Sequence, residues 1–370
     1  MPGLKCMLLP LRIRGDILSL LKKLFCMLLI YSGICRLVSF INRNSVKILV
    51  YHGIIKGNLP AGLNCEGLHL KLESFERHIA YLKKRYRILD LNEFVEHLKE
   101  GKPLPQYSAV LTFDDGYKNN YENLKDIILK HEVPVSIFLA TDYIGTPELL
   151  WLDSLEMAFF NTRRKSIFSS QAIGIGSMQW RSEREKMQKF AILKNYLKKL
   201  PFNKLKEALK DLFSELVSDK GAGPGRIDDT PYTRLLNWDE VRELAQYGVR
   251  FGSHTCRHEI LTALSDSEVR NTLEKSFSAI KEHCGDGGIP FAYPNGNFND
   301  EIKKAVAVAG YNCALTTVHG FNSGTSDLYA LKRNEIGNKG DIHIFIATLS
   351  GTLDFIKSFA RLPKRDVCIF

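Results

Sequence analysis

Residues 108–116 read SAVLTFDDG and place two carboxylates directly after a short apolar run. The apolar and β-branched residues 108–113 predict a buried strand. Adjacent carboxylates repel each other, which raises the pKa of at least one of them unless a cation compensates. The side chains of Asp114 and Asp115 diverge on a strand, so we expect a bend at Gly116 to turn both toward one pocket. An ordinary Asp-Asp-Gly turn is the simpler alternative.

Strands and helices alternate on both sides of this stretch. We expect further strands at residues 46–51, 87–89, 135–139, 249–252, 290–293 and 313–317. Helical spacing predicts helices at residues 73–84, 92–99, 117–131, 238–247, 265–283 and 300–309, the second of them capped by Asn92. This alternation predicts an α/β fold whose parallel sheet is covered by helices, either open or closed into a barrel. In such folds the chemistry lies at the carboxyl ends of the strands.

One region interrupts the alternation. Residues 155–235 are rich in Lys, Arg and Glu, show helical periodicity, and end in the loop GAGPGRIDDTP at residues 221–231. We interpret residues 155–235 as a mostly helical insertion.

A second expected strand, at 249–252, ends in SHTCRH. If this segment forms one helical turn, His254 and His258 face the same way, with the spacing of a zinc-binding pair. Two histidines and one carboxylate make a metal site that leaves coordination positions for water and substrate. Cys256 would point away from both histidines in such a turn. Alone, the His-x-x-x-His spacing is equally consistent with a surface coincidence.

Two more strand ends carry candidate groups. Residues 291–296 read FAYPNG and close in a turn whose backbone N–H could bind an oxyanion. Residues 50–53 read VYHG, and His52 is a candidate acid because it stands at the same kind of position. The alternatives are an ordinary β-turn and a structural histidine.

Together these segments resemble the polysaccharide deacetylases, the NodB-homology or carbohydrate esterase family 4 group. TFDDG at 112–116 matches the first motif of that family, His254-Thr255-x-x-His258 matches the second, and FAYPNG is similar to the third. The resemblance covers roughly residues 46–340, apart from much of the insertion, and implies a distorted (β/α) barrel. YHGI at 51–54 resembles the poly-N-acetylglucosamine deacetylase subgroup, in which an N-terminal strand supplies a catalytic histidine.

The third motif departs from the family pattern. Many members carry an arginine that orients the catalytic base, and Ala292 stands at its place, with Asn295 at the place of a tyrosine. Arg333, in LKRNEI, is a candidate replacement from a later strand. A surface position for Arg333 is the alternative.

The resemblance implies a metal-dependent hydrolase that removes N-acetyl groups from an amino sugar in a polysaccharide or a lipid-linked glycan. Asp115, His254 and His258 would hold a divalent metal, for which zinc is the default by ligand type. Asp114 would be the general base and His52 the general acid, and the backbone N–H of Asn295 would bind the oxyanion. An O-acetyl esterase and an inactive glycan-binding member of the same fold are the alternatives.

The net charge of +10 over 370 residues is concentrated at the N-terminus. Residues 1–50 contain eight Lys or Arg against Asp16 alone, so the remaining 320 residues are close to neutral. That body contains no basic stripe with interleaved aromatics, and we therefore expect no nucleic-acid partner.

Residues 24–34, LFCMLLIYSGI, form an uncharged run that Arg36 ends. A bilayer span needs roughly 20 apolar residues, so the basic flanks favour a helix in the membrane interface. A signal anchor and a soluble packing helix are the alternatives. We expect a membrane-associated segment at 1–45, a catalytic domain at 46–350 and a tail at 351–370. The eight scattered cysteines slightly favour the cytoplasmic face of the membrane.

Overall fold

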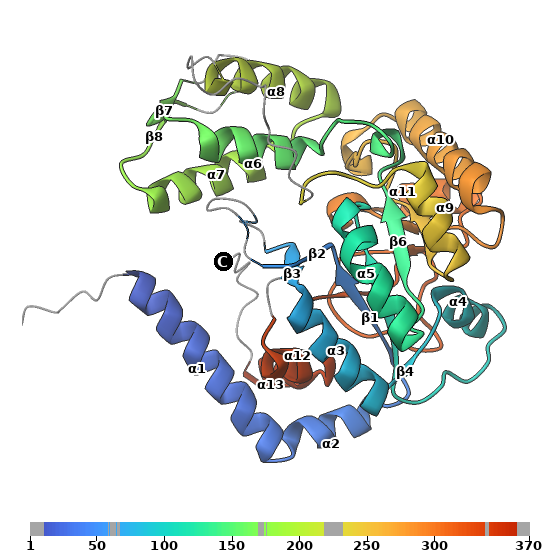
Figure 1. Cartoon of the computed structure of the whole chain (residues 1–370). Coiled ribbons are helices and arrows are strands. Elements are labelled where there is room, and N and C mark those ends of the chain that lie inside the picture. Colours follow the sequence, from blue (N-terminus) through green and yellow to red (C-terminus); the bar gives the residue numbers. More distant parts are fainter. Residues whose placement is uncertain are drawn as a thin grey trace, which may run out of the picture.

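Eight short parallel strands form the central sheet of the computed structural model (Figure 1). The structure describes residues 11–57, 67–168, 176–217, 232–336 and 340–360, together with residues 59, 64 and 174. The sheet follows the order β11-β10-β9-β6-β5-β1-β12, and β4 pairs with β5. These strands are β1 (Val46–Tyr51), β4 (Arg87–Ile88), β5 (Ser108–Phe113), β6 (Ser136–Leu139), β9 (Arg250–Ser253), β10 (Pro290–Ala292), β11 (Cys313–Leu315) and β12 (Asn334–Glu335).

One segment near the C-terminus connects the two edges of this sheet. Leu331 forms a parallel bridge with Leu315 of β11, and β12 pairs with β1 a few residues later. The sheet is therefore curled rather than open. It matches the expected distorted (β/α) barrel.

Helices cover the outside of the sheet, as the alternation predicted. They are α3 (Leu72–Arg85), α4 (Leu91–Lys99), α5 (Lys118–His131), α9 (Trp238–Gln246), α10 (Asp266–Cys284) and α11 (Asp300–Val308). Their apolar faces and the strands form the main hydrophobic core. Three single 3₁₀ turns also lie in loops: η1 (Thr141–Tyr143), η2 (Leu261–Ala263) and η3 (Pro294–Gly296).

The expected cap of α4 is wrong. Asp90, not Asn92, precedes the helix, and its carboxylate accepts hydrogen bonds from the backbone N–H of Asn92 at 2.8 Å and of Glu93 at 3.4 Å. The helix therefore begins at Leu91. Asn92 faces inward, and its Nδ2 donates to the carbonyl oxygen of Gly287 at 2.7 Å. Both residue types cap helices well, and only the fold determines which one is free to do so.

The insertion is mostly helical, as expected, and begins a few residues earlier. It contains α6 (Trp151–Asn161), the antiparallel hairpin β7 (Ser166–Ile167) and β8 (Met178–Gln179), α7 (Glu183–Leu197) and α8 (Phe202–Val217). Its buried side chains form a separate apolar cluster that includes Phe159, Phe190 and Leu212. The expected loop at 221–231 lies outside the described residues.

Other elements carry no clear sequence pattern and were not predicted. β2 (Gly53–Ile55) pairs with β3 (His69–Lys71), and α12 (Ile342–Leu349) and α13 (Thr352–Ala360) follow the barrel. Helix α13 lies in the segment expected to be a tail, and residues 361–370 lie outside the described part of the chain.

The N-terminal segment forms a bent pair of helices, α1 (Leu11–Tyr31) and α2 (Ile34–Ile41). Gly33 adopts a φ of 80° between them, a conformation that glycine tolerates best. Among the described residues, no single helix is long and apolar enough to cross a membrane. Residues 18–31 of α1 and the whole of α2 pass the same test together, but the two are bent by 71°.

Candidate metal centre

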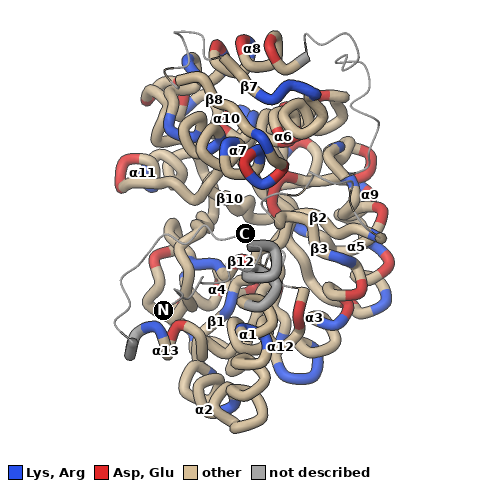
Figure 2. Tube along the Cα trace, turned by 90° about the vertical axis from the view of Figure 1, so that its left-hand side faces the viewer, with Lys and Arg blue, Asp and Glu red and all other residues tan. Residues whose placement is uncertain are grey.

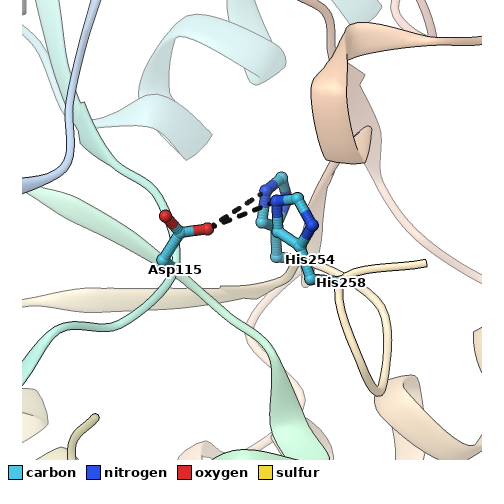
Figure 3. A group of neighbouring side chains, drawn as sticks. All are labelled: Asp115, His254 and His258. Atoms are coloured by element: carbon cyan, nitrogen blue, oxygen red, sulfur yellow. Dashed lines mark ion pairs between the residues drawn. The ribbon is translucent and has the colours of Figure 1, made fainter. Parts of the chain in front are cut away.

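Asp115, His254 and His258 converge at the carboxyl edge of the sheet (Figure 3). Asp115 follows β5 and His254 follows β9, and β6 lies between these two strands. Asp115 Oδ1 lies 3.6 Å from His254 Nε2 and 3.5 Å from His258 Nε2. The candidate ligand atoms all lie within 4.8 Å of one another, so one ion can reach all three.

The backbone at Asp115 separates it from Asp114. Asp114 continues the strand pairing, since its N–H donates to the carbonyl oxygen of Tyr51 at 3.0 Å. Asp115 then adopts a φ of 72°, which a non-glycine residue rarely does. The bend includes Gly116, as expected, where φ is 78°, but it begins one residue earlier, at Asp115. It sends the two carboxylates to different partners, and backbone strain of this kind is typical of functional sites.

The expected helical turn at His254–His258 is also wrong. Thr255 and His258 adopt φ values of 66° and 55°, and the segment is a loop after β9. Neighbouring backbone fixes this loop, because the N–H of Thr141 donates to the carbonyl oxygen of Thr255 at 3.1 Å. The histidines converge all the same. Cys256 points away, and its buried thiol donates to the carbonyl oxygen of Thr272 at 3.5 Å.

Hydrogen bonding prepares His254 as a ligand. Its Nδ1 lies 2.8 Å from the carbonyl oxygen of Ala292, which can only accept, so Nδ1 carries the proton and Nε2 is left with a lone pair. Burial lowers the pKa of His254 to about 4 and the pKa of His258 well below its usual value. Both rings are therefore neutral at pH 7, as metal binding requires.

The environment of Asp115 disfavours the ionised form that metal binding needs. Burial, and then the charge of Asp114, raise its pKa well above the usual value. Among the described residues, no donor reaches its buried Oδ1. A buried carboxylate oxygen without a donor is costly, and a cation between it and the two histidine nitrogens would satisfy it. The three side chains therefore fit a divalent metal by donor type, burial and convergence.

Asp114 is paired with Arg333, the replacement that the sequence suggested. The guanidinium Nη1 and Nη2 donate to the two carboxylate oxygens of Asp114, each at 2.7 Å, and Arg333 Nε donates to the carbonyl oxygen of Thr316 at 2.8 Å. Arg333 is buried, so it is no surface residue. Burial alone would raise the pKa of Asp114, but Arg333 outweighs it and holds that pKa well below the usual range.

His52 and Asn295 lie at neighbouring strand ends. His52 is half-buried after β1, and its Nδ1 has no hydrogen-bond partner among the residues that the structure describes. Burial lowers the pKa of His52, and the charge of Asp114 opposes that shift. Asn295 lies in η3 after β10 with a φ of 56°, and its exposed side chain donates to Asn297 Oδ1 at 2.6 Å.

The insertion forms a wall beside His258, and the sequence alone did not identify which of its residues do so. The insertion reaches over the edge of the barrel, and Leu197, Lys198 and Phe202 line a mostly apolar pocket together with His258. Asp153 of α6 is buried nearby, and it accepts a hydrogen bond from the hydroxyl of Tyr117 at 3.0 Å. Burial raises the pKa of Asp153 to about 7. The helical periodicity of the insertion does not indicate which of its residues approach His258.

These features define a class of enzyme. A buried facial set of two histidines and one carboxylate, beside an ionised carboxylate at the edge of a (β/α) barrel, is the arrangement of a metallohydrolase. A family model described as polysaccharide deacetylase matches residues 101–187 and 206–314, more than half of the chain. The chain belongs to the polysaccharide deacetylase family. It is a hydrolase of the polysaccharide deacetylase class, which acts on carbon–nitrogen bonds.

Individual relatives are distant. The protein YxkH of Bacillus subtilis is 21% identical over 289 residues, which cover 78% of this chain and 70% of that protein. The poly-beta-1,6-N-acetyl-D-glucosamine N-deacetylase of Staphylococcus epidermidis is 24% identical over 236 residues, which cover 61% of this chain and 77% of that enzyme. The Streptococcus pyogenes deacetylase PplD, solved with acetate, has a TM-score of 0.53 at 17% identity, over 83% of this chain and 99% of that one. It shares the fold.

Proposed function

We propose that this protein hydrolyses the N-acetyl groups of a glycan built from N-acetylglucosamine or a closely related amino sugar, with a divalent metal held by Asp115, His254 and His258. The convergence of these three ligands, with the Oδ1 of Asp115 left without a donor among the described residues, is the observation that carries the proposal. When bound, the metal supplies Lewis-acid polarisation of the acetyl carbonyl and a lowered water pKa, toward about 7. We take zinc as the default, although two nitrogens and one oxygen also suit cobalt, nickel or manganese.

Asp114 acts as the general base in this proposal. Arg333 keeps Asp114 ionised and fixes its plane through two parallel hydrogen bonds. Each carboxylate oxygen has a second lone pair, so Asp114 can still accept the proton of the attacking water. Because Asp114 is not one of the three converging ligands, its basicity is not used up in holding the metal.

In this proposal His52 is the general acid, and Asn295 binds the oxyanion through its backbone N–H. An amine is a poor leaving group until it is protonated, so a separate acid is needed beside the base, and His52 donates that proton. Burial lowers the pKa of His52, and the charge of Asp114 opposes that shift. The backbone N–H of Asn295, at the turn after β10, donates to the oxyanion.

The choice of sugar rests on the relatives. The Staphylococcus epidermidis enzyme is named for the polymer poly-β-1,6-N-acetylglucosamine. A polymer of N-acetylglucosamine, or its lipid-linked precursor, is therefore the first substrate to try. The pocket between the insertion and His258 supports recognition of groups beyond the acetylated ring, because it opens directly beside the proposed ligand.

The test is acetate release from N-acetylhexosamine oligomers, lipid-linked N-acetyl sugars and an O-acetylated glycan. Each substrate is incubated with the purified full chain, with the chain after chelation, and with the chelated chain resupplied with zinc. We expect release from an N-acetyl substrate that chelation abolishes and zinc restores. Release from the ester alone would identify an O-acetyl esterase. No release from any substrate by protein resupplied with metal would overturn the proposal.

A further inference from the structure

The helix pair α1 and α2 exposes an apolar surface that the chemistry of the site does not use. Large apolar side chains point outward along both helices and are each between 40% and 77% exposed. We call this surface the outer face; it includes Leu21, Leu24, Leu28, Tyr31, Leu37 and Ile41. A helix on the surface of a soluble domain normally places polar residues there.

The opposite side of the pair is already buried in the protein. Cys26, Leu29 and Cys35 pack against Ile344 and Ala347 of α12. Polar contacts reinforce this packing: Lys23 Nζ lies 2.9 Å from Asp341 Oδ2, and Asn42 Nδ2 donates to the carbonyl oxygen of Ser350 at 3.1 Å. In Figure 1, α12 and α13 lie between α1 and the barrel. The pair is thus apolar on both sides, and among the described residues only the inner side has a partner.

The bend and the inner packing argue against a transmembrane span. The two helices meet at 71°, so their combined length does not follow one axis. To cross a bilayer, the pair would have to leave its buried contacts with α12, which include the fully buried Cys26. An element that keeps its inner contacts can only lie along a membrane surface, with its outer face inserted at the acyl boundary.

The charges around the outer face identify its partner. From Leu18 to Ser45 the sequence contains no acidic residue, and besides Lys23, which pairs with Asp341, it contains Lys22, Arg36 and Arg43. In Figure 2, α2 shows basic but no acidic colouring. The guanidinium of Arg43 lies over the ring of Phe40, 4.1 Å from its centre, so a cation is fixed beside an apolar group. A second copy of this chain would bring like charges face to face, whereas anionic lipid headgroups would neutralise them.

We propose that the outer face docks this protein on the surface of a bilayer that contains anionic lipids, without crossing it. Apolar side chains enter the acyl boundary while the basic residues meet the headgroups. The catalytic barrel is thereby held beside the membrane, where a lipid-linked or newly assembled glycan would be available. This docking is independent of the hydrolytic chemistry.

The test is co-sedimentation of the full chain with vesicles of phosphatidylcholine alone and of phosphatidylcholine with 30% phosphatidylglycerol (about the anionic content usual for such assays). We expect binding to the anionic vesicles that falls at high salt. The triple variant Leu21→Gln, Leu28→Gln and Leu37→Gln should bind at least about tenfold more weakly. The matched control is Leu129→Gln, Ile192→Gln and Val308→Gln, which alters exposed apolar residues elsewhere and should bind as the wild type does.

Each other outcome contradicts the proposal. Equal binding by both variants would show that the outer face is not the docking surface. Retention on vesicles after a carbonate wash would indicate a span. A dimer that the outer-face variant converts to a monomer, with no vesicle binding by the wild type, would identify a second copy as the partner. Acetate release from soluble oligomers should be unchanged in both variants, which separates a docking failure from a failure of folding or of the proposed function.

Discussion

Soluble proteins bury apolar residues and expose charged ones, and two regions of this protein depart from that pattern. The carboxyl edge of the barrel buries charges, and the N-terminal helix pair exposes apolar side chains. At the edge, charged groups such as Asp114, Asp115 and Arg333 are buried. Along α1 and α2, large apolar side chains face outward. Buried charges and contiguous exposed apolar residues both lower the stability of a water-soluble fold, so each needs a purpose. The comparison shows that this chain deviates from ordinary folding chemistry at two places, and that each place predicts its own partner.

The two regions differ in what completes them. Asp114 has its partner in Arg333, while Asp115 and the two histidines converge as candidate ligands of a cation. The inner side of the helix pair also has its partner, α12, whereas no partner covers its outer face among the residues that the structure describes. In each region, some groups have their partner within the chain. The remaining groups predict a metal at the barrel edge and a lipid surface at the helix pair.

Replacing the base should give the largest effect on the chemistry. We expect Asp114→Asn to lower kcat by about 10²–10⁴, because proton transfer from the attacking water is lost. The variant should still bind metal, since Asp114 is not among the three converging ligands. Acetate release and metal content are measured on the same preparation. Wild-type acetate release by this variant would remove Asp114 from the base role.

Removing the partner of the base should mainly cost stability. Arg333→Met leaves Asp114 as an uncompensated buried charge, and we expect a loss of about 3–5 kcal/mol in the free energy of unfolding, measured by urea denaturation. The double variant Asp114→Asn with Arg333→Met should recover part of that loss, because the buried charge is then gone. Arg333→Lys keeps the charge but not the paired hydrogen bonds, so its free energy of unfolding should lie between those of the wild type and Arg333→Met. Equal stability of all three variants would contradict a structural pairing.

A smaller effect should come from Asp153, a buried carboxyl outside the ligand set. Its folded pKa of about 7 lies above the ordinary value of 3.8, so the folded state holds the proton more tightly than the unfolded state. Stability from this group is therefore full below about pH 4 and falls as the pH rises toward 7. Asp153→Asn should abolish that slope and raise stability at pH 8 by about 1–3 kcal/mol.

The matched control for this prediction is Asp126→Asn, which alters an exposed carboxyl on α5. It should leave the pH dependence of unfolding unchanged. If thermal melts of Asp153→Asn between pH 4 and pH 8 follow the wild-type slope, Asp153 does not retain its proton in the folded protein.

The sequence predicted the main architecture because the strands of this sheet are short apolar runs that end in polar motifs. Strands β5, β9 and β10 were recognisable for that reason, and parallel pairing brings their carboxyl ends to one edge. The residue types of the three proposed ligands, read against the known family pattern, were therefore sufficient to find the cluster. The suggestion of Arg333 as the partner of Asp114 came from the absence of an arginine at Ala292.

Local geometry was less predictable. The left-handed backbone at Asp115 begins the expected bend one residue before Gly116, and the left-handed backbone at Thr255 and His258 replaces the expected helical turn. Such conformations depend on long-range contacts, for example between the N–H of Thr141 and the carbonyl oxygen of Thr255. The approach of Lys198 to the pocket at His258 likewise depends on how the insertion docks, which periodicity does not encode.

The most direct test of the account is the metal content of the purified wild type and of His254→Ala, measured by mass spectrometry of the metal beside acetate release. We expect about one divalent ion per wild-type chain and loss of both metal and activity in His254→Ala, because the buried facial set would lose one of its three ligands. Stoichiometric metal in His254→Ala, or full activity in metal-free wild type, would contradict the proposed centre at Asp115, His254 and His258.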